Sequence, residues 1–291
     1  MTKLIYAIGP SYSGKSYYGE YFTEQGFVVV SSDKIRKELY GDESIQGNPA
    51  EVFQIAHQRA LEFLQKGENV YFDSTGLKAA QRIQFLEYIK KVDCEKECIV
   101  FLVSNDILQQ RYASRERKVP WGVIEKQLQS FQIPCYGEGW DKISRVREGE
   151  YSLVDQLYHC MDEPHDNPHH DYTIGNHMVE AARLAVAYKA NEHARRAALW
   201  HDIGKPFSKV WYNAKGEVSD VAHYYHHENL GAYYYALGSQ DMDWLEVANL
   251  IQWHMAPYIY GDKKLKALEK RLGEKLWNDL QMLHKCDLEA H

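Results

Sequence analysis

The chain has 291 residues, about twice the length of a typical domain, which predicts two domains. Its composition, 45% hydrophobic and 26% charged, is ordinary for a globular protein. No apolar run approaches the roughly 18 residues of a membrane span, and neither a secretory signal nor zinc-type cysteine spacing is present, so we expect a cytoplasmic protein with reduced thiols and no membrane partner. A net charge of −7 argues against a broad basic surface for long duplexes, although a few arginines could still hold a nucleic-acid end.

A phosphate-binding motif follows the first predicted strand, residues 4–8. Residues 9–16 read GPSYSGKS, and a helix is predicted from Lys15 to about Thr23. Backbone N–H groups and the helix N-terminus of such a loop bind phosphate oxygens. A glycine-containing turn without a ligand is the alternative, and the match of the motif and both flanks disfavours it.

The motif predicts a nucleoside triphosphate site for ATP or GTP with Mg²⁺. Lys15 is expected to contact the β- and γ-phosphates, and Ser16 is expected to bind the Mg²⁺ ion. The residues expected around the nucleotide phosphates are Gly9, Ser11, Ser13, Gly14, Lys15, Ser16 and Tyr17.

Strands and helices are predicted to alternate through the first half of the chain. Apolar runs at residues 27–31, 69–72 and 98–103 predict three more strands, separated by helical segments. This alternation predicts an α/β fold, with a parallel sheet and helices on both faces. Ligands of such sheets bind at the carboxyl ends of the strands, where Ser16, Asp33, Asp73 and Thr75 are expected.

Several charged residues near these strand ends have two interpretations. Asp33 is either a general base for an attacking hydroxyl or the N-cap of the helix that follows. Asp73 is either a site carboxylate or a turn residue. Arg111 and Arg115 lie four residues apart on a helix predicted from Ser104, where they either clamp a phosphoryl group or form a solvated face.

Four segments in order resemble the 5′-hydroxyl polynucleotide kinases of the bacteriophage end-healing type: GPSYSGKS, SSDKIRKEL, FDSTGLKAAQR and RYASRERKVP. The resemblance covers residues 3–135. It implies that Asp33 is the general base on the 5′-OH and that Arg36 contacts the phosphate beside the accepting nucleotide. Arg115 would be the lid arginine on the donor phosphates, with Arg111 also on the nucleotide side.

The same resemblance places Asp73, Thr75 and Arg82 on the acceptor side. One position departs from the family pattern. The third motif usually reads D-x-T-N, and Gly76 stands in place of the asparagine.

The sequence pattern changes near residues 140–151, where glycines and charges are followed by helical periodicity. We therefore predict a kinase domain over residues 1–148 and a second, all-α domain over residues 149–291. Of 14 histidines, only His57 and His159 precede residue 165. Histidines set into apolar helical surroundings favour a metal site.

Residues 200–206 read WHDIGKP. Adjacent His201 and Asp202 can face one site only where a helix ends, and Gly204 with Pro206 predicts such an end. Imidazole and carboxylate together suit Mn²⁺, Fe²⁺, Co²⁺, Ni²⁺ or Zn²⁺. An isolated His-Asp pair would more often be a core or capping pair.

The second half resembles the HD phosphohydrolases, most closely the HD domains of the tRNA nucleotidyltransferase type. The matching segments within residues 166–290 are NPHHDYTIGNH, ALWHDIGKP, HHENLGA, IQWH and HKCDLEA. The resemblance implies metal ligands, and one or two divalent ions, at His177, His201, Asp202, Asp287, His227 and His254. Water activated by such ions becomes a nucleophile at phosphorus.

Three further assignments concern residues around these ligands. Lys205 is expected to balance charge on phosphoryl oxygens, and His170 to contact either substrate or a ligand. His226 competes with His227 for the ligand position, and the family spacing favours His227. A tyrosine cluster either stacks on a base or packs in the core: Tyr224, Tyr225, Tyr233, Tyr234 and Tyr235.

Together these patterns predict a bifunctional enzyme that heals RNA ends, with DNA ends as a further substrate class. The kinase would phosphorylate 5′-OH ends, and the HD domain would hydrolyse 2′,3′-cyclic phosphate or 3′-phosphate ends. One alternative is a small-molecule or nucleoside kinase fused to a nucleotide phosphohydrolase. Another is a kinase regulated by a catalytically silent HD sensor. The sequence leaves the oligomeric state open.

Overall fold

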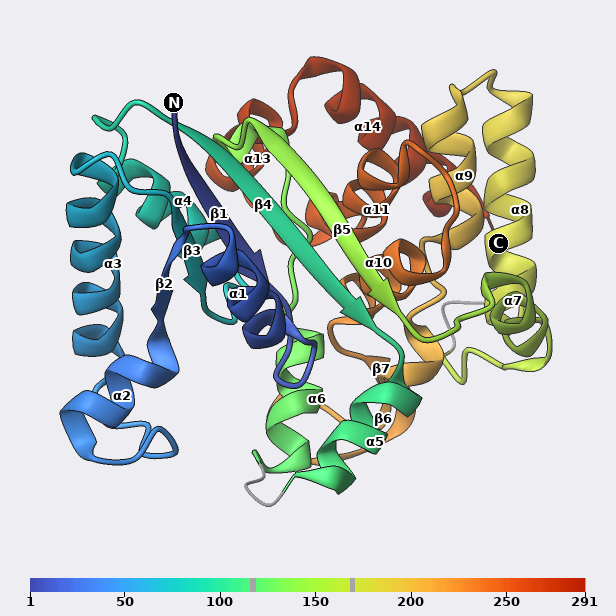
Figure 1. The fold of residues 1–291 in the computed structure, drawn as a ribbon. Helices are drawn as coiled ribbons and strands as arrows, with labels where there is room; N and C mark the ends of the chain where they lie inside the picture. The colour runs from blue at the N-terminus through green and yellow to red at the C-terminus, as the bar shows by residue number, and fades with distance from the viewer. Residues whose placement is uncertain (116–118, 168–170, 291) are drawn as a thin grey trace. The chain divides into compact units, whose positions relative to one another are not determined.

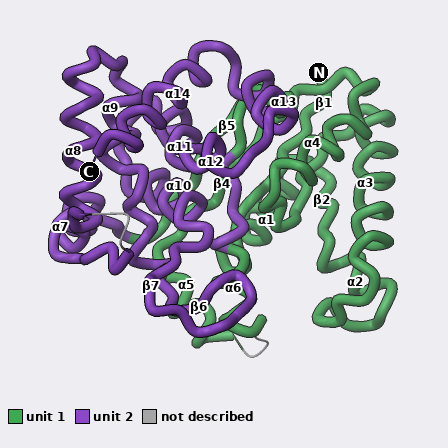
Figure 2. The backbone as a smooth tube through the Cα atoms, turned by 180° about the vertical axis from the view of Figure 1, so that it is seen from behind, with its two compact units in different colours: residues 1–127, 134–149 green, residues 128–133, 150–291 purple. Residues whose placement is uncertain are grey.

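A computed structural model describes residues 1–115, 119–167 and 171–290 (Figure 1). These residues form two compact units, coloured separately in Figure 2. Unit 1 contains residues 1–127 and 134–149, and unit 2 contains residues 128–133 and 150–291. The main division therefore lies between residues 149 and 150, but a short segment before it belongs to unit 2.

Unit 1 is built on a five-stranded sheet in the order β2-β3-β1-β4-β5, and every pair of neighbouring strands is parallel. Its strands are β1 (Thr2–Ile8), β2 (Val28–Ser31), β3 (Val70–Asp73), β4 (Cys94–Val103) and β5 (Lys142–Glu148). The predicted parallel α/β sheet is confirmed. β5 adds an edge strand that the sequence did not predict, because its residues KISRVRE are largely polar.

The helices of unit 1 are α1 (Lys15–Glu24), α2 (Ser32–Tyr40), α3 (Pro49–Gln65), α4 (Ala79–Tyr88), α5 (Asn105–Ser114) and α6 (Trp121–Gln129), with a 3₁₀ turn at Tyr136–Glu138. Side chains alternate across a strand, so β1 contributes to two cores. On one face, Ile5 and Ala7 join a cluster against which Tyr18 and Phe22 of α1 pack.

The opposite face of the sheet is filled by aromatic rings. Tyr6 stacks on Phe72 with ring centroids 4.9 Å apart, and Phe72 meets Phe85 of α4 at 4.7 Å. His57 of α3 lies 4.8 Å from the Phe85 ring. The helices therefore cover both faces, and both cores fix the strand ends that carry the site residues.

Unit 2 is mostly helical. Its helices are α7 (Leu153–Asp162), α8 (Ile174–Ala187), α9 (Glu192–Trp200), α10 (His227–Gly238), α11 (Trp244–Trp253), α12 (Ala256–Ile259), α13 (Asp262–Leu272) and α14 (Glu274–Glu289), with a 3₁₀ turn at Lys205–Phe207. Helices α8 and α9 run side by side in both views (Figures 1 and 2). Unit 2 also contains an antiparallel hairpin, β6 (Lys209–Tyr212) and β7 (Val218–Tyr224), which the all-α prediction lacked.

The tyrosine cluster of the sequence divides into two groups. Tyr233 and Tyr235 are fully buried and Tyr234 is 6% exposed, which confirms the core interpretation for these three. Tyr225, by contrast, is 39% exposed at the end of the hairpin.

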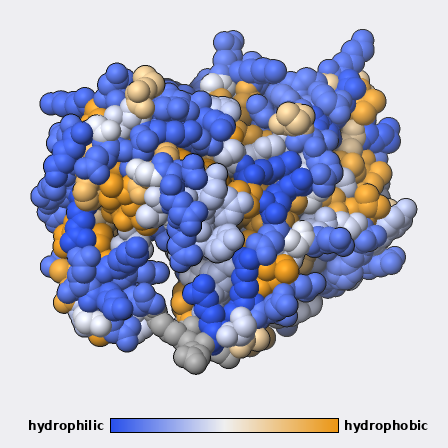
Figure 3. All heavy atoms as spheres, viewed as in Figure 1, coloured by the Kyte–Doolittle hydropathy of each residue, from blue (hydrophilic) through white to orange (hydrophobic). Residues whose placement is uncertain are grey.

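No helix within the described ranges is both long and apolar enough to cross a membrane. The face drawn in Figure 3 is largely hydrophilic, and polar side chains separate its apolar patches.

Candidate active sites

The phosphate-binding loop of unit 1 is closed around its own lysine. Lys15 Nζ donates to the carbonyls of Gly9 at 2.9 Å and Pro10 at 2.7 Å, and to Ser13 Oγ at 3.2 Å. Burial lowers the pKa of Lys15 to about 8, although the nearby carboxylates of Asp73 and Asp33 act to raise it. A buried ammonium held only by neutral oxygens is well suited to an incoming anionic phosphate.

The loop needs left-handed backbone at two positions. Gly14 has φ 93° and Tyr12 has φ 68°. Tyr12 is held there from both ends, because its carbonyl accepts from Arg111 Nη1 at 2.9 Å and its hydroxyl accepts from Val119 N–H at 2.7 Å. The loop conformation is thus supported by the chain that follows β4.

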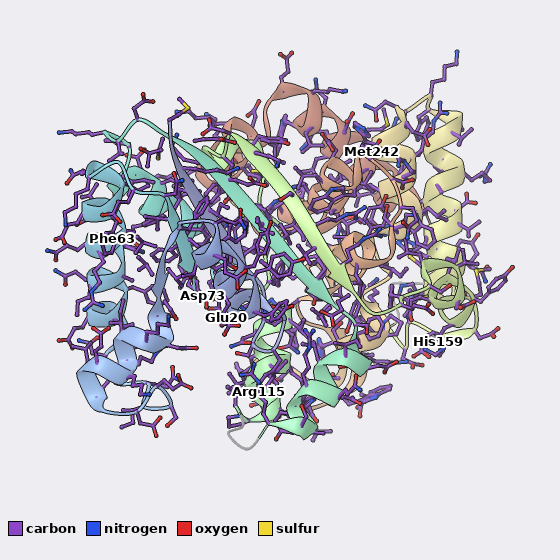
Figure 4. All side chains as sticks on the ribbon, viewed as in Figure 1. Glu20, Phe63, Asp73, Arg115, His159 and Met242 are labelled. Atoms are coloured by element: carbon purple, nitrogen blue, oxygen red, sulfur yellow. The ribbon has the colours of Figure 1, made fainter. Side chains whose placement is uncertain are left out.

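Ser16 and Asp73 meet at the carboxyl ends of the strands. Ser16 Oγ donates to Asp73 Oδ2 at 2.8 Å. Burial raises the pKa of Asp73, against the influence of Lys15 and Ser16. Figure 4 shows Asp73 at the end of β3, near α1. A hydroxyl and a carboxylate together have the oxygen chemistry that Mg²⁺ requires, and this hydrogen bond places Asp73 beside Ser16, the residue expected to bind Mg²⁺.

Asp33 is not the N-cap of α2. Ser31 has that position, and its hydroxyl accepts from Lys34 N–H at 3.5 Å. Asp33 lies two residues after this N-cap, with its side chain 59% exposed and Oδ1 accepting from Arg36 Nη1 at 2.5 Å. The capping alternative is therefore wrong, and the carboxylate remains accessible to an acceptor.

The backbone and packing at Gly76 explain why a glycine stands there in place of the asparagine of the family pattern. Its φ of 53° is left-handed, and a Cβ added there would lie 2.7 Å from both Ile8 Cγ2 and Tyr6 Cε1. Any larger side chain would displace the core under the loop. The carbonyl of the preceding residue, Thr75, accepts from Gly9 N–H at 3.2 Å. This hydrogen bond links the turn after β3 to the phosphate loop.

The resemblance implies that Arg82 contacts the acceptor, but in the structure its guanidinium is buried. Its side chain is 0% exposed and forms a double ion pair with Glu138, at 2.8 Å from Nε and 2.7 Å from Nη2. Its Nη1 donates to the carbonyls of Gly76 and Leu77 at 2.9 and 3.2 Å. In this structure Arg82 therefore fixes the Gly76–Leu77 turn and presents no free guanidinium to an acceptor.

We expect Arg82→Ala to lower the free energy of unfolding by about 3–5 kcal/mol, because it leaves the buried Glu138 carboxylate without its partner. Arg59→Ala is the matched control, since Arg59 and Glu38 form an exposed pair with side chains 40% and 51% accessible. That pair should contribute about 0.2–1 kcal/mol. Urea-induced unfolding of both variants measures the difference, and equal losses would contradict the structural role.

The two arginines expected on the nucleotide side, Arg111 and Arg115, differ in their contacts. Arg111 is anchored to the Tyr12 carbonyl and to Glu148, whereas Arg115 is exposed with its guanidinium 5.3 Å from the Tyr12 ring centroid. Figure 4 shows Arg115 beyond the same strand ends as Asp73. Among the other expected nucleotide residues, Ser11 donates its N–H to Gln127 Oε1 at 2.7 Å, and Tyr17 is 75% exposed.

The histidine and aspartate residues predicted from the HD resemblance form one buried cluster in unit 2. His177 Nε2 lies 3.1 Å from His201 Nε2 and 2.9 Å from Asp287 Oδ1. His227 Nε2 lies 3.2 Å from His254 Nε2 and 3.2 Å from Asp202 Oδ1. Two groups with metal-ligand geometry share Asp202: His177, His201 and Asp202, and Asp202, His227 and His254.

Backbone carbonyls orient four histidines of the cluster in the same way. Their Nδ1 atoms lie 2.6–2.9 Å from backbone carbonyls, those of Ala290, Ala198, Tyr224 and Ile251 for His177, His201, His227 and His254 respectively. A carbonyl can only accept, so each Nδ1 carries a proton and each Nε2 is the nitrogen that faces the centre. This is the arrangement in which imidazole binds a metal.

Helix ends bring the ligands together. His201 and His254 are the C-cap residues of α9 and α11, and His227 is the first residue of α10. Gly204 allows the close approach, because a Cβ there would lie 2.1 Å from the His227 carbonyl oxygen and 2.5 Å from Gly231 N. Gly204, which caps the 3₁₀ turn after α9, is therefore also needed to place His227.

The charged groups of the cluster shift one another's pKa values. Burial acts to lower the pKa of His201, but Asp202 and Asp287 outweigh it and raise that pKa to about 10. Burial opposes ionisation of Asp202, yet Lys205 and His201 hold its pKa well below the usual range. Lys205 and His201 thus balance the two buried carboxylates in this structure, and a bound divalent cation would supply positive charge at the same place.

Two residues near the cluster were not predicted. His165 is 2% exposed, and its Nε2 lies 3.1 Å from Lys205 Nζ, which also contacts Asp202 Oδ2 at 2.6 Å. Tyr258 donates its hydroxyl to Asp287 Oδ2 at 2.9 Å. The histidine-rich segment before α8 signalled the first of these but not which histidine, whereas a lone tyrosine gives no signal.

The competing histidine assignments also have outcomes. His226 is exposed with φ 63° and lies outside both metal groups, so His227 is the residue that contacts the cluster. His170 lies outside the described residues, and its role stays a prediction.

Matches to two known protein families agree with this two-part organisation. A search of curated proteins gave no match. Among solved structures, the Pnkp1/Rnl/Hen1 RNA repair complex matches with 20% identity and a TM-score of 0.39, covering 44% of this chain and 43% of that one. A gluconokinase from Sinorhizobium meliloti 1021 matches with 18% identity and a TM-score of 0.37, covering 53% and 86%. Residues 4–134 match the AAA domain family and residues 174–280 match the HD domain family, so the chain joins a P-loop kinase-like AAA domain to an HD domain.

Proposed function

We propose that this protein heals nucleic-acid ends, phosphorylating 5′-OH termini in unit 1 and hydrolysing 2′,3′-cyclic phosphate or 3′-phosphate termini in unit 2. One observation carries the proposal: the same chain contains a phosphate-binding loop motif around Lys15 and a buried His-Asp cluster around Asp202. Many nucleases leave ends that ligases cannot join, and these two reactions together restore a joinable end.

In the kinase half, phosphoryl transfer requires positioning and charge more than covalent catalysis. Lys15 would leave its carbonyl partners for the β- and γ-phosphates of the donor, and Ser16 with Asp73 would hold Mg²⁺. Asp33 would accept the proton of the 5′-OH as its oxygen attacks the γ-phosphorus and the nucleoside diphosphate leaves. Arg36, whose Nη1 donates to Asp33, would contact the phosphate beside the accepting nucleotide and so bring the 5′-OH to that base.

In the HD half, two divalent ions fit the two ligand groups that share Asp202. When bound, they would supply Lewis-acid stabilisation of phosphoryl oxygens and a water of lowered pKa. Lys205 would place its ammonium beside the same oxygens, since it lies 2.6 Å from Asp202 Oδ2 and is almost fully buried. His165 would hold that ammonium from the other side.

The test is an oligonucleotide with a 5′-OH and a 3′-phosphate, incubated with ATP or GTP, Mg²⁺ and either Mn²⁺ or Ni²⁺. We expect a 5′-phosphate to appear and the 3′-phosphate to be released, and RNA and DNA versions compare the two substrate classes. Equal phosphorylation of a free nucleoside would support the small-molecule kinase instead. Kinase activity with an inert HD half toward every end and nucleotide would support the sensor alternative.

A further inference from the structure

Tyr258 joins the surface of unit 2 to the buried cluster of histidines and aspartates. The residue is 46% exposed, yet its hydroxyl donates to Oδ2 of the buried Asp287 at 2.9 Å. A tyrosine combines an apolar ring with a polar tip, so one side chain can extend from solvent to a buried polar group. The contact places a hydrogen-bond donor from outside the ligand set on a carboxylate of the cluster.

The backbone that carries Tyr258 is fixed by a short helical turn. His254 is the C-cap residue of α11, and the four-residue helix α12 begins two residues later, at Ala256. A proline, Pro257, stands at the start of α12, where its restricted φ favours a helical turn. Tyr258 N–H donates to the Met255 carbonyl at 3.1 Å, which closes that turn. Tyr258 therefore lies four residues after a histidine of the cluster, on a constrained segment.

The ring of Tyr258 is held by α14, the helix that carries Asp287. Its centroid lies 4.5 Å from the centroid of the His284 ring, with 81° between the two planes, which is an edge-to-face contact. His284 precedes Asp287 by three residues in α14, so the two side chains are neighbours on that helix. The helix that supplies the carboxylate therefore also packs against the ring whose hydroxyl reaches it.

The two oxygens of Asp287 have different partners. Oδ1 lies 2.9 Å from His177 Nε2 and 3.2 Å from His201 Nε2, the nitrogens that face the centre. Oδ2 accepts from the Tyr258 hydroxyl. A donor on one oxygen restricts rotation of the carboxylate and leaves the other oxygen directed at the ligand nitrogens. Asp287 is thereby oriented before an ion binds.

We propose that Tyr258 is the positioning residue of Asp287, holding Oδ2 so that Oδ1 faces a divalent ion bound at His177 and His201. The inference rests on the proposed function only for its metal ions. Partners that hydrogen-bond to metal ligands typically contribute about 10–100-fold to metal affinity. The effect should be confined to the ion at His177 and His201, because Asp287 Oδ1 faces the nitrogens of these two residues.

The experiment titrates the metal-free, full-length protein with Co²⁺ in competition with a chelator. Tyr258→Phe removes the hydroxyl and keeps the ring against His284, and it should weaken the binding of one of two ions about 10- to 100-fold. The same loss should appear in a His227→Ala background, which retains the ion at His177 and His201. It should be absent in a His177→Ala background, which retains the ion at the other group.

Tyr188→Phe is the matched control, because the Tyr188 hydroxyl also donates to a carboxylate of α14, that of Glu289, which lies outside both metal groups. Both affinities should stay at their wild-type values in this variant. Unchanged Co²⁺ affinity in Tyr258→Phe, equal weakening of both ions, or a similar loss in Tyr188→Phe would overturn the positioning role.

Co²⁺ binding is measured without substrate, so it separates this inference from the proposed hydrolysis. A protein that shows the expected losses of affinity but hydrolyses no end would support the role of Tyr258 and overturn the hydrolysis. A wild type that binds no Co²⁺ would overturn both.

Discussion

Asp202→Ala should abolish hydrolysis at 3′ ends and remove metal from both ligand groups at once. Asp202 is the residue that the two groups share, with Oδ2 3.6 Å and 3.4 Å from the Nε2 atoms of His177 and His201, and Oδ1 facing those of His227 and His254. Elemental analysis should give close to two transition-metal ions in the wild type and few in the variant. Kinase turnover should stay nearly unchanged, because unit 1 contains its own site.

Two further variants sharpen this result. His227→Ala should lose about one ion and keep the other, since His177, His201 and Asp287 remain. His193→Ala is the matched control, because His193 also pairs with an aspartate of unit 2, Asp243 at 3.0 Å, but lies outside both metal groups. Full metal content in Asp202→Ala would contradict the shared-ligand arrangement, and loss of metal in His193→Ala would show a general effect on folding.

Lys15→Ala and Asp33→Asn should each abolish 5′ phosphorylation while leaving 3′-end hydrolysis intact. The Lys15 ammonium donates hydrogen bonds to Gly9, Pro10 and Ser13, all within the phosphate loop. Its removal should therefore weaken donor binding as well as turnover. For Asp33, a positioned general base typically contributes on the order of 10²–10⁴-fold to the rate. Steady-state kinetics with a 5′-OH oligonucleotide measure both losses.

The control for this pair is Lys37→Ala, an exposed residue of the same helix as Asp33. Arg36→Ala should weaken polynucleotide acceptors more than donor binding, since Arg36 is attached to the base rather than to the loop. A loss of less than about tenfold in Asp33→Asn would reduce Asp33 to a first-turn acidic residue of α2.

Strong local patterns made most of the fold predictable. The GKS loop requires a strand before it and a helix after it, and the β-branched runs that follow are too short and apolar for surface helices. The histidines and aspartates of the cluster were predicted through the resemblance to the HD phosphohydrolases, because no local spacing links residues as far apart as His177 and Asp287. The start of α3 also has a local signal, because Asn48 precedes Pro49 and its Oδ1 accepts from Ala50 N–H at 3.1 Å.

What the sequence did not reveal depends on partners far along the chain. The burial of Arg82 follows from Glu138, 56 residues later, and no local pattern signals such a pair. His165 is placed by the Tyr172 carbonyl and by Lys205, and the neighbouring histidines in sequence look equivalent to it. The hairpin was missed because its strands alternate poorly and contain several charged or polar residues.

The segment Leu128–Ile133 limits how the two activities can be dissected. Within unit 2, Gln252 Nε2 donates to the Ile133 carbonyl at 3.3 Å, Asn229 Nδ2 donates to the Gln129 carbonyl at 2.8 Å, and the Phe131 ring packs on Tyr233. A fragment that starts at residue 150 would therefore leave the amides of Gln252 and Asn229 and the ring of Tyr233 without these partners. Asn229 and Tyr233 belong to α10, the helix that begins with His227. Because residues 128–133 of unit 2 lie within the stretch of chain that forms unit 1, no single cut in the chain yields both units whole.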